Sequence, residues 1–125
     1  GGSFVHTAGG TGNITTTGTS KTISGSNITL NNLIISTGSI STTSTLTLAG
    51  DLTVNGPLSA SAGNITFSGA GKTISGSSTI QLAGVEVTGS LSTARDLLIS
   101  SNLSVPGSFT ATAGQVTFNG TSTFS

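Results

Sequence analysis

A gapless internal repeat of 51 residues is the strongest constraint on the fold of this chain. Residues 12–62 laid over residues 63–113 give 22 identities in 51 positions. Segments 12–15 and 21–26 return unchanged as 63–66 and 72–77. Long repeats indicate structural units that stack, because no single unit can bury its apolar face alone.

The repeat divides the one domain expected of 125 residues into four parts. These are a partial leading unit at 1–11, complete units at 12–62 and 63–113, and a partial third unit at 114–125. The leading segment 3–9 resembles segment 108–114 at both of its ends (Ser-Phe and Ala-Gly). The pattern is that of a window cut from a longer array, or of a subunit that continues into a copy of itself.

Inside each unit, apolar residues alternate with Thr or Ser over short runs, as in 46–48, 52–54 and 116–118. This period of two is typical of strands, and the Gly and Asn-Gly pairs between the runs supply turns. Three short strands would make a rung of roughly 17 residues, with about three rungs per unit and about seven in the chain. Two longer rungs per unit are the alternative.

A β-sandwich would show the same alternation, but it needs bulky core residues, and the chain has no Trp and no Tyr. Its two halves would also have no reason to repeat. We therefore predict an all-β fold, a parallel β-solenoid (β-helix) with right-handed winding and no α-helix of note.

The composition excludes several functions. Gly, Ser and Thr make up 65 of the 125 residues, and only six residues carry full charge. Such a chain offers no basic face to phosphates, so we expect no nucleic-acid partner. The longest aliphatic runs have three residues (33–35 and 97–99), so we expect no membrane insertion and no signal peptide. The chain has no Cys, and hence no disulfide framework and no zinc cluster.

Two features suggest anion binding, but a structural role explains each of them better. Segment 69–73 looks like the end of a phosphate-binding loop, but Thr66 stands where that motif needs Gly, and a strand rather than a helix is expected next. Lys21 and Lys72 are expected on one face, about three rungs apart. Two such charges make no patch, and a lysine at a strand end discourages unwanted pairing.

Catalysis needs convergent groups, and the sequence scatters them. Asp51, Glu86 and Asp96 lie far apart, and His6 is the only histidine. We interpret Arg95-Asp96 as an exposed turn pair in the place of Ser44-Thr45. We expect no enzyme activity, no catalytic, metal or cofactor site, and no cofactor.

Three other groups of residues invite a functional reading. Thr runs at 15–17 and 43–47 would order ice-like water if they stacked into ladders, but their equivalents in the next unit include Phe67 and the pair Arg95-Asp96. Each of five asparagines begins an Asn-x-Ser/Thr triplet: Asn13, Asn27, Asn64, Asn102 and Asn119. We expect Asn13 and Asn64 to stack as an amide ladder at a corner, and Phe67, Phe109 and Phe118 to fill the interior.

Segments 107–120 and 72–78 resemble the repeats of very long bacterial β-strand-repeat surface proteins, which are similar in style to filamentous-haemagglutinin-type and autotransporter adhesins. The resemblance covers nearly the whole chain. It implies an exported, extracellular or cell-surface protein with a structural or adhesive role, such as an adhesin shaft, stalk or filament subunit.

The expected partner is the chain itself, with the final rung near 109–124 stacking on the Ser3-Phe4 rung of another copy. An ice-binding solenoid is the first alternative, and a glycan-binding adhesin region that recognises surface glycans is the second. The residues of a binding site are not specified by the sequence.

Overall fold

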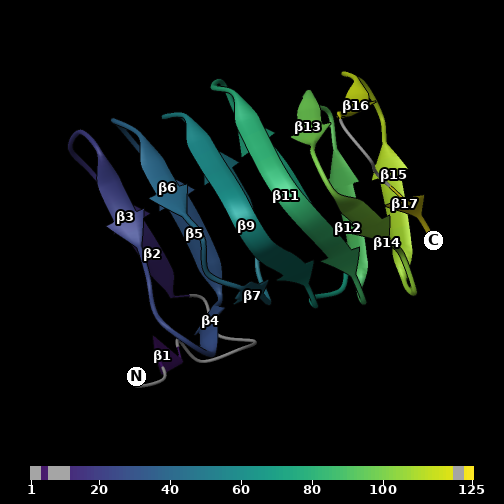
Figure 1. The fold of residues 1–125 in the computed structure, drawn as a ribbon, viewed down its shortest axis with the longest axis horizontal. Coiled ribbons are helices and arrows are strands. Elements are labelled where there is room, and N and C mark those ends of the chain that lie inside the picture. The colour runs from purple at the N-terminus through teal and green to yellow at the C-terminus, as the bar shows by residue number, and fades with distance from the viewer. Residues whose placement is uncertain (1–3, 6–11, 120–122) are drawn as a thin grey trace.

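The chain folds into parallel strands stacked as a β-solenoid of about six turns, which confirms the predicted fold class. The structure is a computed structural model that describes residues 4–5, 12–119 and 123–125, and this part of the chain contains no helix. Figure 1 shows the strands as a row of slanted arrows that follow one another along the long axis. The right-handed winding stays a prediction.

Each turn contributes one strand segment to each of three faces. Face I is the six-stranded sheet, and faces II and III together form the eleven-stranded sheet. Strands β9 (Leu58–Phe67) and β11 (Ile80–Val87) run across the corner that joins faces II and III, so each belongs to both.

The other strands are short. Face I contains β2 (Asn13–Thr16), β5 (Asn32–Ile35), β8 (Leu52–Val54), β10 (Lys72–Gly76), β12 (Ser90–Thr93) and β15 (Ser108–Ala111). Face II contains β3 (Lys21–Ile23), β6 (Ile40–Thr42), β13 (Leu97–Ile99) and β16 (Val116–Phe118). Face III contains β1 (Phe4–Val5), β4 (Ile28–Leu30), β7 (Leu46–Leu48), β14 (Asn102–Ser104) and β17 (Thr123–Phe124).

The rungs are longer than the sequence predicted. On face I, the side-chain hydrogen bond from Asn32 to Asn13 on the rung below spans a sequence separation of 19. The bond between the Thr53 and Ser75 hydroxyls, also on neighbouring rungs, spans a separation of 22, because the corner at 68–71 is extended. The predicted rung is therefore too short for most of the molecule, and the chain forms about six turns rather than seven.

The repeat units do not lie directly above one another. Asn13 begins β2 on face I, whereas Asn64 lies in the part of β9 that belongs to face III. Asn64 lies eight strand segments further along the chain than Asn13. Since three segments make one turn, the two positions are two and two-thirds turns apart rather than three. Each unit is thus rotated about the solenoid axis by one third of a turn from the unit before it.

The corners show that equivalent residues keep the same local structure on different faces. The buried Thr42 hydroxyl at the end of β6 accepts the Ser44 N–H at 3.0 Å. Thr93, the equivalent residue of the next unit at the end of β12, accepts the Arg95 N–H in the same way at 2.9 Å. The repeat therefore encodes a strand followed by a corner, and this local structure forms at corners that follow different faces.

Stacked glycines let successive corners approach each other closely. Two columns occur, one in each complete unit: Gly18, Gly38 and Gly56, and then Gly69, Gly89 and Gly107. A Cβ atom added at the second or third glycine of either column would overlap the backbone carbonyl oxygen of the glycine one rung below. Much of the high glycine content follows from this close approach of backbone to backbone.

The interior is a continuous column of Leu, Ile and Val side chains that alternate with outward Ser and Thr. Phe67 is 1% exposed and fills this interior, as predicted, and Phe109 is half-buried against it. Phe118 differs from the prediction, because it is 42% exposed. It lies on β16, which pairs with β13 and with no second strand among the residues that the structure describes.

We predict that Gly56→Ala destabilises the protein by about 1–3 kcal/mol, the usual range for a group forced into a packed site. The reason is the overlap of the new methyl group with the Gly38 carbonyl oxygen. Urea denaturation followed by circular dichroism measures the change. The control is Ser59→Ala, on an outward position of β9, with an expected change within about 0.5 kcal/mol. Equal effects of the two substitutions would contradict the close stacking of the corners.

Candidate functional site

The three carboxylates have structural roles and lie on three different faces. Asp51, just before β8, accepts the Thr73 N–H at 2.9 Å, and Asp96, just before β13, accepts the Gln115 N–H at 2.8 Å. Glu86 accepts the Thr66 hydroxyl at 3.4 Å on face III. Within the described residues, no group of three or more His, Cys, Asp or Glu could hold a metal ion. His6 lies outside the described residues, as do Ser3 and the Ala8-Gly9 pair.

The expectation that Lys21 and Lys72 share a face is wrong. Lys21 begins β3 on face II and Lys72 begins β10 on face I, because the repeat advances by two and two-thirds turns. The segment that resembles a phosphate-binding loop is a turn, with Gly71 at φ 65°, followed by a strand. The observed strand agrees with the structural reading of this segment.

The prediction that Asn13 and Asn64 stack as an amide ladder is wrong, because Asn64 lies on face III, and a ladder of other residues forms at the Asn13 corner. Asn13 stacks on Asn32 rather than on Asn64, and the Asn32 amide donates to the Asn13 Oδ1 at 2.9 Å. The Asn32 Oδ1 accepts the Asp51 N–H at 2.8 Å, and Asp51 in turn accepts from Thr73. This ladder crosses four rungs at the start of the face I strands and satisfies backbone groups at that corner.

Arg95 is half-buried, so the expected exposed turn pair is correct only for Asp96. The Arg95 Nη2 donates to the Ser78 carbonyl oxygen at 3.2 Å, and its Nε is buried without a hydrogen-bond partner. Asp96 takes the place that Thr45 has one unit earlier: Thr45 accepts the Asn64 N–H, as Asp96 accepts that of Gln115. The pair is a variant of the repeated corner.

A threonine ladder does form, although the comparison of the two units argued against it. Thr29, Thr47 and Thr66 occupy the outward position of face III on three successive rungs, in register. Glu86 takes the same position on the next rung and ends the ladder. The sequence argument failed here because a ladder joins residues that are one rung apart, not residues that are one repeat unit apart.

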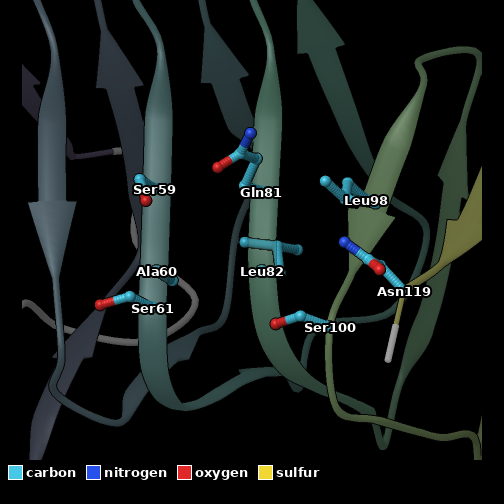
Figure 2. A pocket seen from close by; sticks show the side chains of 8 residues that line it. All are labelled: Ser59, Ala60, Ser61, Gln81, Leu82, Leu98, Ser100 and Asn119. Carbon is cyan, nitrogen blue, oxygen red and sulfur yellow. The ribbon is translucent and has the colours of Figure 1, made fainter. Parts of the chain in front are cut away.

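The outer surface of face II is hollowed on both sides of two side chains, Gln81 of β11 and Leu98 of β13. One hollow, of about 290 Å³, appears in Figure 2; its lining consists of Ser59, Ala60, Ser61, Gln81, Leu82, Leu98, Ser100 and Asn119. The other, of about 260 Å³, is lined by Thr79, Ile80, Gln81, Asp96, Leu97, Leu98, Gln115 and Thr117. We call the two hollows together the face II trough.

Sequence reasoning missed Gln81 and Leu98. The signal was the unbroken run Leu97-Leu98-Ile99, in which the central residue must face outward if the strand alternates. Run 33–35 has the same form, and Ile34 faces outward on face I. A second apolar surface lies at the end of the solenoid, where Phe118 (42% exposed) and Phe124 (70% exposed) meet edge to face, with ring centroids 6.4 Å apart.

No family model matches the chain, and no curated protein or solved structure matches it either. The fold and the surfaces described above define it as a parallel β-solenoid. Among the described residues, no helix is both long and apolar enough to span a membrane.

We predict that Asn32→Ala lowers the free energy of unfolding by about 1–2 kcal/mol, chiefly because the half-buried Asp51 N–H loses its acceptor, while the exposed Asn13 side chain can bond to water instead. Thermal and urea unfolding measure the effect. Asn55→Ala is the matched control, since Asn55 is an exposed corner residue. A loss no greater for Asn32 than for Asn55 would show that the ladder does not stabilise the corner.

Proposed function

We propose that this chain is a mechanical element, a stiff section of an extracellular bacterial surface protein that serves as a shaft, stalk or filament subunit. The observation that carries the proposal is that most of its distinctive side chains are used within the solenoid. Asp51, Asp96 and Asn32 close corners, the glycines permit stacking, and the aliphatic residues fill the interior. The resemblance of its segments to β-strand-repeat surface proteins supports an extracellular location.

Parallel ladders in all three faces favour stiffness. Each rung is joined to the next by backbone hydrogen bonds, as in Ser36 N–H to the Thr16 carbonyl and Asn55 N–H to the Ile35 carbonyl, at 3.0 and 2.8 Å. Bending would stretch such bonds on one face and compress the others. A formal net charge of zero and a Ser/Thr surface also avoid repulsion between rungs.

Association through the solenoid end is part of the proposal. Among the described residues, strands β15, β16 and β17 each pair on one side only, and the rings of Phe118 and Phe124 belong to two of these edge strands. Open edges and exposed aromatic side chains both favour pairing with a further rung. A second copy offers the edges of β1, β2 and β3, with Ile14 and Ile23 half-buried at the interior. Contacts of this head-to-tail kind generate filaments when they do not close into rings.

Small-angle scattering and sedimentation across a dilution series test this proposal. We expect rod-like particles whose mass rises with concentration, and we expect the double variant Phe118→Ser, Phe124→Ser to weaken association at least tenfold. Ile34→Ser, which removes an outward apolar side chain from face I, is the control and should leave association unchanged. A compact particle would contradict the rod. A strictly monomeric wild-type chain at high concentration, or equal association of the double variant, would contradict end-to-end stacking.

A second candidate function is the ordering of water at ice, which the ladder of Thr29, Thr47 and Thr66 favours. Its hydroxyl and methyl groups repeat at the spacing of adjacent strands, about 4.8 Å. Three rungs make a short array, and Glu86 interrupts it. Thermal hysteresis that disappears in Thr47→Lys would support this function over the mechanical one, and its absence in the wild-type chain would exclude it.

A further inference from the structure

The size of the outward side chains on face II changes along the solenoid. On its first three rungs the central outward residues are Thr22, Ser41 and Ser59, all small hydroxyl side chains. On the next two rungs they are Gln81 and Leu98, which are larger and are followed by Thr117. The face II trough lies on either side of these two side chains.

Between β9, β11 and β13, the trough offers a ligand side chains and no free backbone edge. Strand β11 pairs with β9 on one side and with β13 on the other, and β13 pairs with β16. An extended peptide therefore cannot add to the sheet beside Gln81 or Leu98, although the outer side of β16 is unpaired among the described residues. Recognition must come from the polar groups and from the apolar surface of Leu98.

The chemistry of the lining selects a neutral ligand. No Lys or Arg lines either hollow, and the one carboxylate is that of Asp96, whose Oδ1 accepts the Gln115 N–H. Phosphate groups would find no cation, and a metal ion would find a single carboxylate. The lining instead presents the amide of Gln81 and the hydroxyls of Ser59, Ser61 and Ser100, all at half-exposed or exposed positions.

We propose that the face II trough binds an uncharged oligosaccharide, with the apolar face of one sugar ring on Leu98 and its hydroxyls hydrogen-bonded to Gln81 and Ser100. Amides and hydroxyls both donate and accept hydrogen bonds, which matches the hydroxyl groups of a sugar. Rungs repeat at about 4.8 Å, close to the length of one sugar unit in an extended chain, so neighbouring rungs contact neighbouring sugars. This proposal goes beyond the mechanical role and does not depend on it.

Chemical-shift titration of the ¹⁵N-labelled chain with neutral hexasaccharides tests the proposal. The probes are β-1,4-linked glucose, β-1,4-linked N-acetylglucosamine and α-linked mannose, with a polygalacturonic acid fragment as the charged comparison. For at least one neutral probe we expect shifts centred on the amides of Gln81, Leu98 and Ser100. The charged fragment should bind more weakly, because Asp96 repels it.

Substitutions complete the experiment. Leu98→Asp and Gln81→Ala should each weaken binding about tenfold or more, while Ile34→Asp, the matched change on face I, should leave it unchanged. Unaltered circular dichroism spectra of all three variants separate a lost contact from a lost fold. No shift with any neutral probe at millimolar concentration, shifts centred on another face, or equal binding by the Leu98→Asp and wild-type chains would each overturn the proposal. A failure of the rod to associate end to end would leave this result unaffected.

Discussion

In-register parallel pairing between successive rungs is the interaction on which the rest of this structure depends. A rung of three short strands has almost no interior of its own, and residues such as Leu33, Leu52 and Ile74 become buried only through stacking. Stacking at strand spacing requires the corners to approach as closely as the strands do. The two glycine columns meet that requirement. A methyl group at Gly38, Gly56, Gly89 or Gly107 would overlap the carbonyl oxygen of the glycine one rung below.

The sequence was sufficient to predict the fold class, because alternation, turn residues and a long repeat all favour a parallel solenoid. It was insufficient for the stacking register. The length of the repeat suggested three whole rungs per unit, which would be nine strand segments. Each unit instead contains eight segments, so the next unit begins on a different face. The errors about Lys21 with Lys72, and Asn13 with Asn64, share this cause. Corner length decides register, and a corner such as 68–71 lengthens its rung without a change in the strand pattern.

The rotation between units has a consequence for the surface. Residues at equivalent positions of consecutive units face different sides, as Thr15 on face I and Thr66 on face III do. Ladders on one side are therefore built from residues one rung apart that the repeat does not relate, such as Thr29 and Thr47. The face II trough arises in the same way, from Gln81 and Leu98, which pair on adjacent rungs. Its position was beyond sequence analysis because it depends on this register.

Distance measurement between pairs of spin labels tests the stacking register most directly, and the absence of native cysteine makes the labelling specific. Labels at Thr47→Cys and Thr66→Cys should lie on adjacent strands, about 5 Å apart at the backbone, and show strong dipolar broadening. Labels at Thr15→Cys and Thr66→Cys, which are equivalent positions of consecutive units on different faces, should show none. Strong broadening in the second pair and not in the first would contradict the register and the rotation between units.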